Sequence, residues 1–428
     1  MKTVSPPPTT LEAAADASHD PYAALRHPGY RAFVLGRSVF MIGGQMQTAA
    51  VAWFIYERLG SALALGYVGL VQIIPIIVLA LPAGHVADRL DRRKLIAAGQ
   101  SVFFACSLGL AAISWWHGPA LLIYALLFIL ACARIFIIPA MGALLPGVVP
   151  RPLWANAATW NSSVFELTGM VGPALAGLAI AASGGATAVF LLAAGCSALA
   201  LTLFLRLRVS QVILPKKAAT WSDVLGGLHF LFSTRLLLAA AALDLFAVLL
   251  GSATALLPVV AKDILHVGPV GFGWLRAAPS LGAVAMALLT VHRQPWRHAG
   301  RVLLFAFVGY GLAVIVFGFS RSFSLSLAML VLTGAFDNIN VIIRQTLMQY
   351  ITPDEMRGRV TAVNFIFIGC SNELGAFESG VAARLLGTAP AIVAGGAGAL
   401  IVTLVVARLA PGLRRLGRLQ DIRSAPVV

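Results

Sequence analysis

The chain has 428 residues, of which 59% are hydrophobic and only 11% are charged, and its formal net charge is +15. Ordinary soluble domains carry about 25% charged residues, so this composition excludes a soluble enzyme, a disordered chain and a secreted disulfide scaffold. The mean hydropathy of +0.90 indicates an integral membrane protein. The apolar runs are long and lack the alternation of a membrane β-barrel, which predicts helical spans.

Twelve apolar runs predict an all-α membrane protein with two bundles of six helices. In chain order these runs occupy 33–56, 64–83, 95–115, 119–140, 160–182, 186–206, 236–258, 270–291, 301–320, 323–345, 360–386 and 389–409. The longest polar stretch, 207–235, predicts a linker between an N-terminal bundle (33–206) and a C-terminal bundle (236–409). Residues 1–32 and 410–428 are expected to be tails, the second of them basic.

The basic residues lie mostly on one side of the predicted spans. If the N-terminus is cytoplasmic, the segments on that side hold 24 of the 31 Lys and Arg residues, the opposite segments hold four and the spans hold three. Cytoplasmic segments of membrane proteins are enriched in Lys and Arg. We therefore expect a multi-pass protein of the bacterial plasma (inner) membrane with both termini in the cytoplasm, and the positive charge needs no nucleic acid partner.

The two predicted bundles show a weak internal repeat at an offset of 203 residues. Four pairs match, and each copy is a proline-containing loop that leads into a helix rich in small residues: Pro150 and Pro353, Asn161 and Asn364, Gly172 and Gly375, Gly177 and Gly380. Two six-span repeats with a substrate site between them are typical of large transporters.

The loop between the second and third runs reads Gly84-His-Val-Ala-Asp88-Arg89-Leu-Asp91-Arg92-Arg93-Lys94. This loop resembles the signature loop of the major facilitator superfamily. Many members carry Gly at the position of Asp91, and the variant with Asp resembles the form found in the enterobactin-exporter-like branch of transmembrane secretion effectors. Gly84 is expected to permit a tight turn. The resemblance implies that Asp88 binds the start of the eleventh span, near Arg357-Gly358-Arg359, and thereby latches one conformation. A plain basic loop that orients the chain is the alternative.

Two further segments carry the same resemblance. The fifth run contains Gly169-Met-Val-Gly172-Pro173-Ala-Leu-Ala-Gly177, which resembles the superfamily's Gly-Pro motif, often linked with exporters. Its small residues at a spacing of four line one helix face and let another helix approach closely, and the proline can set a bend. Ordinary packing is the alternative. In the eleventh run, the segment 371–380 resembles the corresponding segment of the enterobactin-exporter-like branch.

Charged side chains within a span are costly and mark functional positions. Arg134 in the fourth run and Glu166 in the fifth lie at similar depth on consecutive helices, so we expect them to pair. The resemblance adds a coupling role for Arg134, because a basic residue in the fourth span couples protons in proton-driven relatives. A static ion pair that joins the two helices is the alternative.

In the second half, Asp337 and Arg344 lie seven residues apart on one face of the tenth run, which predicts that they pair. Glu373 in the eleventh run would then be the freer carboxylate. Since a carboxylate inside a membrane protein can bind and release a proton, we expect Glu373 to be the main proton-coupling residue. Glu378, a further candidate for proton coupling or ion pairing, lies about 140° around that helix and is expected to serve a different surface.

Neutral polar side chains at mid-span depth are expected to line a substrate cavity: Gln45, Gln72, Asn338 and Asn372. Bonding between helices is the alternative for each of them. Asp244 and Arg276 are further ionisable candidates. The histidines and cysteines show no spacing typical of a metal site, so no metal is expected.

Together these features predict a secondary active transporter that works by rocking of its two halves. The resemblance favours proton-coupled efflux of a small amphipathic molecule, such as a drug or siderophore. No P-loop is present, so we expect no cofactor and the proton motive force as the energy source. Uptake of a metabolite is the nearest alternative. A non-transporting receptor or scaffold, or a membrane-embedded enzyme, is the alternative of another class, although the sequence lacks a catalytic cluster. We expect a monomer whose partners are its substrate, protons and the lipid bilayer.

Overall fold

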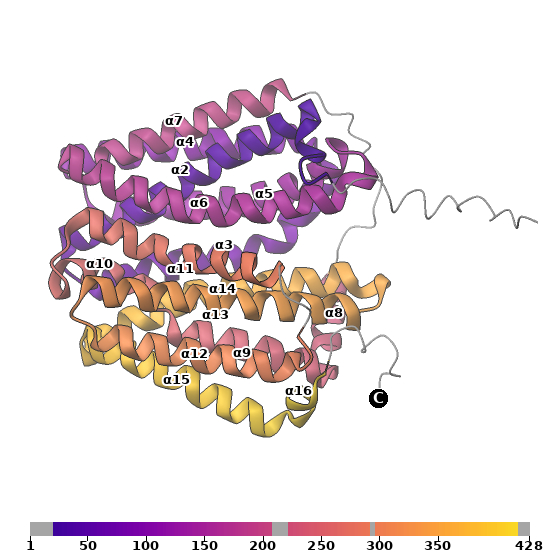
Figure 1. The fold of residues 1–428 in the computed structure, drawn as a ribbon. Coiled ribbons are helices and arrows are strands. Elements are labelled where there is room, and N and C mark those ends of the chain that lie inside the picture. Colours follow the sequence, from indigo (N-terminus) through magenta and orange to yellow (C-terminus); the bar gives the residue numbers. More distant parts are fainter. Residues whose placement is uncertain (1–19, 208–220, 292–295, 418–428) are drawn as a thin grey trace, which may run out of the picture.

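The computed structural model describes residues 20–207, 221–291 and 296–417, and its regular structure there is helical (Figure 1). Twelve of these helices are long and apolar enough to cross a membrane, which confirms the predicted fold class. The first six are α2 (Pro28–Leu59), α3 (Ala62–Arg89), α4 (Arg92–Trp116), α5 (Ala120–Leu144), α6 (Trp154–Ser183) and α7 (Thr187–Arg206). The second six begin with α9 (Arg235–Gly251) and continue with α11 (Gly268–Val291), α12 (Ala299–Phe319), α13 (Phe323–Ile351), α14 (Asp354–Leu386) and α15 (Thr388–Leu409).

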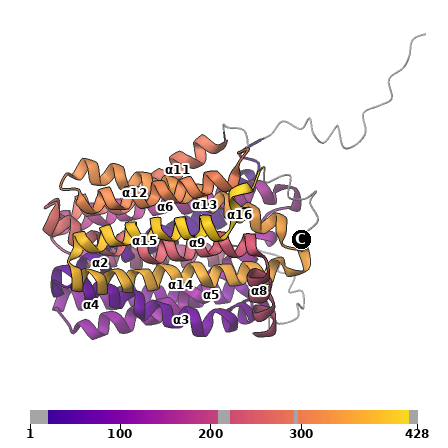
Figure 2. The ribbon, with the colours of Figure 1, turned by 90° about the horizontal axis from the view of Figure 1, so that it is seen from below.

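The two sets of six helices form two halves that lie against each other (Figure 1). Seen from below, the long helices run nearly parallel (Figure 2). We call the end of the molecule at Pro28, the α3–α4 loop and Pro353 the basic end, and the end at Gly60, Gly184 and Gly387 the far end. Two helices end in tight turns at the far end, at Gly60 (φ +58°) and Gly184 (φ +75°). Both residues adopt the left-handed backbone conformation, which glycine adopts more readily than other residues.

The hydrophobic core is shared between the halves at the far end and divided at the basic end. One cluster of buried side chains runs along the whole first half and includes second-half residues only from the far ends of its helices, such as Phe272, Phe317 and Ile392. A separate cluster fills the second half toward the basic end, around Leu243 and Ile343. The halves are therefore joined by apolar packing at the far end.

The seventh span departs from the prediction of one continuous helix over 236–258. Helix α9 ends at Gly251, and the chain continues through η4 (Ala253–Leu256), α10 (Leu257–Val259) and a π-helical turn, η5 (Val260–Ile264). Pro258 has no N–H and cannot continue a regular ladder. The carbonyls freed at the break accept hydrogen bonds from the Tyr310 hydroxyl (to Gly251, 3.1 Å) and the Ser379 hydroxyl (to Ser252, 3.0 Å). Such replacement bonds make a broken helix tolerable inside a membrane protein.

Short helices occur in the segments expected to be tails and linker. A 3-10 turn, η1 (Ala24–Arg26), precedes α2, helix α8 (Trp221–Ser233) follows the linker, and α16 (Pro411–Arg415) follows α15. Leu231 of α8 and Leu413 of α16 are buried in the second-half core, so both helices cover its basic end. The rest of the expected tails and linker, at 1–19, 208–220 and 418–428, lies outside the described residues.

Candidate functional site

At the far end, α6 and α11 touch backbone to backbone. A Cβ atom placed on Gly177 would lie 2.5 Å from the Pro269 carbonyl oxygen and 3.0 Å from Cα of Gly273. Similarly, a Cβ on Gly273 would lie 2.7 Å from the Pro173 carbonyl oxygen. Side-chain carbons do not approach backbone this closely, so only glycine permits the contact. The predicted small-residue face of α6 is thus the face that meets the other half.

A second close contact joins α3 to α14. A Cβ on Gly380 would lie 2.7 Å from Cα of Gly66, and a Cβ on Gly69 would collide with the Glu373 carbonyl oxygen. The rings of Tyr67 and Phe377 lie 6.2 Å apart beside this contact. Both cross-half contacts involve the far halves of their helices.

The internal repeat found in the sequence corresponds to equivalent contacts. Gly172 of α6 packs on the first span of its own half, at Gln45, and its repeat partner Gly375 of α14 packs on the first span of the second half, at Leu249. Gly177 meets the second span of the other half, and its partner Gly380 does the same. Helices α6 and α14 therefore hold equivalent places in the two halves, as the repeat predicts.

An aromatic and polar contact closes the far end between α2 and the broken seventh span. The Tyr56 hydroxyl donates a hydrogen bond to the Asp263 carboxylate. Lys262 Nζ lies 6.0 Å from the centre of the Tyr56 ring, and the rings of Trp53 and Phe272 lie 5.4 Å apart. No sequence pattern indicates the Tyr56–Asp263 bond, because the two residues are 207 positions apart in separate halves.

Toward the basic end, the same face of α6 is open. Ala155, Thr159 and Ser163 recur every four residues on the helix face that carries Gly177, and all three are exposed. Because the core is also divided at this end, the halves are closed at the far end and apart at the basic end.

Three charged side chains from different helices interact electrostatically within the membrane-spanning region. Glu373 of α14 lies within electrostatic range of Arg134 of α5 and Arg276 of α11, beyond ion-pair distance from either. Glu373 is half-buried, and its backbone forms the α3–α14 contact described above. The residue expected to couple protons therefore lies where the two halves meet, near one arginine from each half.

The predicted pair of Arg134 and Glu166 is absent among the described residues. Glu166 instead lies within electrostatic range of Asp337, a carboxylate of α13 in the other half. The reason is that helices at equal depth can present their side chains to different neighbours. Arg134 faces the Glu373 side, whereas Glu166 lies on the α6 face that meets α11.

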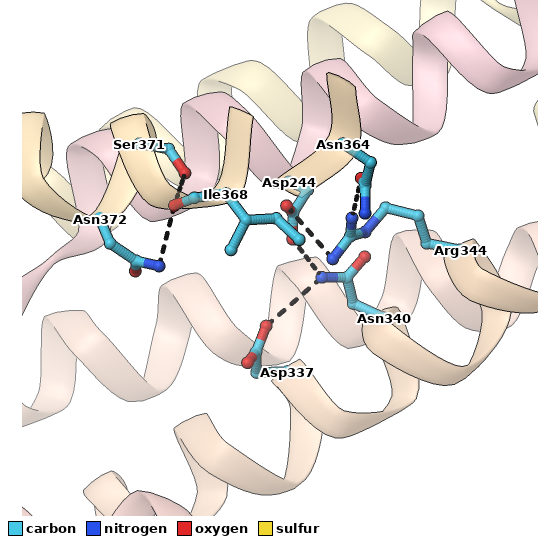
Figure 3. A network of polar contacts seen from close by, with 8 residues as sticks. All are labelled: Asp244, Asp337, Asn340, Arg344, Asn364, Ile368, Ser371 and Asn372. Atoms are coloured by element: carbon cyan, nitrogen blue, oxygen red, sulfur yellow. Dashed lines mark hydrogen bonds and ion pairs between the residues drawn. The ribbon is translucent and has the colours of Figure 1, made fainter. Parts of the chain in front are cut away.

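The predicted pair of Asp337 and Arg344 is also replaced (Figure 3). Arg344 Nη2 lies 3.5 Å from Oδ2 of Asp244 on α9, and its Nη1 lies 2.5 Å from Oδ1 of Asn364 on α14. Asn340 Nδ2 donates to both carboxylates, at 2.6 Å to Asp244 and 3.3 Å to Asp337. Arg344 pairs with Asp244 because this carboxylate approaches from the facing helix α9, whereas Asp337 lies two turns away from Arg344 along α13.

This network ties three helices of the second half together. Arg344 is 4% exposed and Asn340 is 1% exposed, so the contacts are shielded from solvent. The repeat partner of Asn364 is Asn161, whose side-chain oxygen is buried without a hydrogen bond among the described residues. The internal repeat thus singles out Asn364 as an equivalent of Asn161, but no pattern in the sequence indicates that Asn364 binds Arg344.

The signature loop has a different local structure from the one expected at Gly84. Helix α3 continues through Gly84 to Arg89, so this glycine makes no turn. Asp91 begins α4 instead: its Oδ1 accepts from the backbone N–H of Arg93 at 2.9 Å and of Lys94 at 3.4 Å, a typical N-cap.

The arginines of the loop bind the ends of neighbouring helices. Arg92 Nη1 donates to the Ala143 carbonyl at 2.9 Å, and Arg93 Nη2 donates to the Leu205 carbonyl at 2.5 Å. These bonds satisfy carbonyls that a helix end leaves free. The side chains of Asp88 and Arg89 lie outside the described part of the chain, so the latch stays a prediction.

The remaining candidates are dispersed. Gln45 packs on Gly172, Gln72 donates weakly to the Val68 carbonyl at 3.4 Å, and Asn372 donates to the Ile368 carbonyl at 2.9 Å (Figure 3). Asn338 has a buried side-chain oxygen without a hydrogen bond among the described residues, and Glu378 is half-buried beside Ser379. Over the same residues, no group of His, Cys, Asp or Glu is placed to hold a metal ion.

Comparison with known proteins decides the family. The family model described as transmembrane secretion effector matches residues 19–421. The chain belongs to this family of major facilitator transporters. Its relatives include the multidrug efflux pump Tap of Mycolicibacterium fortuitum, 27% identical over 90% of this chain and 95% of the pump. The enterobactin exporter EntS of Citrobacter koseri is also 27% identical, over 94% of this chain and 95% of the exporter.

Solved structures show the same fold at low sequence identity. A mutant of the nucleoside transporter NupG aligns with a TM-score of 0.71 at 12% identity, covering 89% of this chain and 99% of NupG. A bacterial homologue of the human lysosomal transporter Spinster, in an inward-facing and occupied conformation, aligns with a TM-score of 0.69 at 15% identity, covering 93% and 99%. These alignments show the fold alone. The family match and the relatives identify the chain as a transporter and not an enzyme.

Proposed function

We propose that this transporter exports a small amphipathic molecule, such as a drug or siderophore-like compound, in exchange for protons. The observation that carries the proposal is Glu373, a membrane-embedded carboxylate within electrostatic range of Arg134 of one half and Arg276 of the other. A charge at this depth is costly and marks a functional position. The similarity to Tap and EntS, which are named as an efflux pump and an exporter, supports export as the direction.

The proposed orientation places the basic end in the cytoplasm of a bacterial plasma membrane. The excess of Lys and Arg on that side supports it. In the state described, the far end is closed by the glycine contacts and by the Tyr56–Asp263 bond. A monomer in the lipid bilayer would then present its central region to substrates in the cytoplasm.

Export would follow when the halves rock to the opposite state. The backbone contacts of Gly177 and Gly380 would separate at the far end. The exposed basic part of the α6 face, at Ala155, Thr159 and Ser163, would then pack against the basic part of α11. The small side chains on this part of α6 would allow the two helices to pack closely.

Proton coupling would act through the charge of Glu373. When the carboxylate is ionised, it offsets one of the two arginine charges; when it binds a proton, both arginines are left without a counter-charge. Each protonation state therefore gives the interface between the halves a different net charge. Because the three side chains come from both halves, this change acts on the equilibrium between the two states.

The test is accumulation of a panel of fluorescent drugs and siderophores in cells with and without the transporter. We expect lower accumulation with the transporter and reversal by a protonophore. Glu373→Gln should abolish the protonophore-sensitive part. Glu378→Gln on the same helix is the matched control, because Glu378 lies outside the charged set, and it should retain export. Higher accumulation in cells with the transporter would instead indicate uptake, and export by Glu373→Gln that still responds to pH would contradict the coupling role.

A further inference from the structure

Five charged side chains lie within the membrane-spanning parts of five helices: Arg134, Glu166, Arg276, Asp337 and Glu373. Glu373 interacts electrostatically with Arg134 and Arg276, and Glu166 interacts electrostatically with Asp337. Within the described residues, no ion pair joins any of them to another residue, and of the five only Asp337 accepts a hydrogen bond from a side chain, that of Asn340. Proteins usually pair the charges that they place inside a membrane. This set therefore differs from the Asp244–Arg344 pair nearby, in which both charges are compensated.

The positions of Arg276 and Glu166 follow from the helix contacts. Arg276 lies three residues after Gly273 and four before Ser280, and both of these residues touch α6, so all three share one face of α11. Glu166 lies three residues before Gly169, whose added Cβ would meet the Ser280 hydroxyl at 2.5 Å, so Glu166 lies on the α6 face toward α11. With a rise of 1.5 Å per residue, the two charged positions are about 10 Å apart along the interface.

The signs of these charges are separated in space. Arg276 and Arg134 both lie within electrostatic range of Glu373, so this side carries a net positive charge while Glu373 is ionised. On the basic side of the Gly169–Ser280 contact, Glu166 lies within electrostatic range of Asp337, so this side carries a net negative charge. The neighbouring Asp244 adds little negative charge, because Arg344 compensates it at 3.5 Å.

We propose that the transported molecule is zwitterionic, with an anionic group that binds at Arg276 and Arg134 and a cationic group that binds between Glu166 and Asp337. This inference rests on the proposed function and names its substrate class. A molecule with a single positive charge would leave the arginines without a partner, and a molecule with a single negative charge would face two carboxylates. A molecule with both charges compensates both sides of the site.

The same placement favours exchange with protons. The cationic group of the substrate and a proton both bind to carboxylates, so they compete for Glu166 and Asp337. A bound proton thus lowers the affinity of the transporter for the substrate, and export by proton antiport requires this coupling. The anionic group takes no part in this competition and fixes the orientation of the molecule.

The test uses three xanthene dyes that share one ring system and differ in charge: rhodamine 110 as the zwitterion, its methyl ester rhodamine 123 as the cation, and fluorescein as the anion. Binding to the purified full-length transporter in lipid nanodiscs is measured by fluorescence polarisation, and export is measured in everted membrane vesicles. We expect the zwitterion to bind about tenfold more tightly than either the cationic or the anionic dye, which is the effect of losing one charge-assisted hydrogen bond.

Substitution of one charge should change selectivity in a defined direction. Arg276→Gln should weaken binding of rhodamine 110 about tenfold and leave rhodamine 123 unchanged or bound more tightly. Arg321→Gln is the matched control, because Arg321 is exposed in the loop between α12 and α13. Equal binding of the three dyes, or an equal loss of all three in Arg276→Gln, would overturn the inference. Selective binding without export would instead contradict the proposed function and leave this inference standing.

Discussion

The glycine contact between α6 and α11 gives a quantitative prediction about the balance between the two states of the transporter. In Gly177→Ala, the new methyl group would lie 2.5 Å from the Pro269 carbonyl oxygen and 3.0 Å from Cα of Gly273. Both neighbours are backbone atoms, so the helices must separate by several tenths of an ångström to reach ordinary contact. Overpacking of this kind costs about 1–3 kcal/mol. The cost falls only on the state that is closed at the far end.

A cost confined to one state shifts the equilibrium directly. At 25 °C, about 1–3 kcal/mol corresponds to a change of about 5- to 150-fold in favour of the state that is open at the far end. Double electron–electron resonance can report this change, with spin labels on Ser183 and Arg321 in a background without the four native cysteines. These sites lie at the far end of the two halves, so their distance should lengthen in Gly177→Ala.

The matched control is Gly44→Ala on α2, since a Cβ on Gly44 would meet nothing within 4 Å. It introduces the same methyl group into a membrane helix without a clash. Its distance distribution should equal that of the unmodified protein. An unchanged distribution in Gly177→Ala, or an equal shift in Gly44→Ala, would show that the contact does not hold the far end closed.

Three further outcomes follow from contacts described above. Tyr56→Phe removes the hydrogen bond to Asp263 and should lengthen the same far-end distance by less than the glycine substitution does, because about 1 kcal/mol is lost; no lengthening would mean that this bond is unimportant for closure. Asp244→Asn leaves Arg344 without its counter-charge in a buried site and should lower the free energy of unfolding by about 3–5 kcal/mol, visible as a lower melting temperature in detergent; an unchanged melting temperature would contradict the pairing. Asp88→Asn should lower transport without lowering the amount of protein in the membrane, and equal transport rates would refute the latch.

The spans could be predicted because each is a long apolar run, and hydropathy reports burial in lipid directly. Their ends could not, because backbone hydrogen bonds continue a helix beyond the apolar run. Helix α3 therefore extends to Arg89, past the expected end at 83, and takes Gly84 into the helix. The break after Gly251 was also missed, since its freed carbonyls are satisfied by Tyr310 and Ser379 from distant helices.

Depth could be read from the sequence, but the direction of a side chain around its helix could not. Arg134 and Glu166 were expected to pair because they lie at similar depth. The structure places Arg134 near Glu373 and Glu166 near Asp337, since the rotation of each helix is set by its packing partners. The importance of Glu373 as a candidate was apparent from its depth alone, whereas its two arginine neighbours required the tertiary structure.

The equivalent contacts of α6 and α14 also have a consequence for the biogenesis of the protein. Helix α6 packs closely against α11 at Gly177, and α14 packs closely against α3 at Gly380. Each of these helices therefore has its close-packing partner in the other half. When the first six spans have entered the membrane, the glycine groove of α6 still lacks its partner. Assembly of the N-terminal half is therefore finished only after the eighth span has been synthesised, and a ribosome that stalls before that point leaves a half-protein with an open groove toward the lipid.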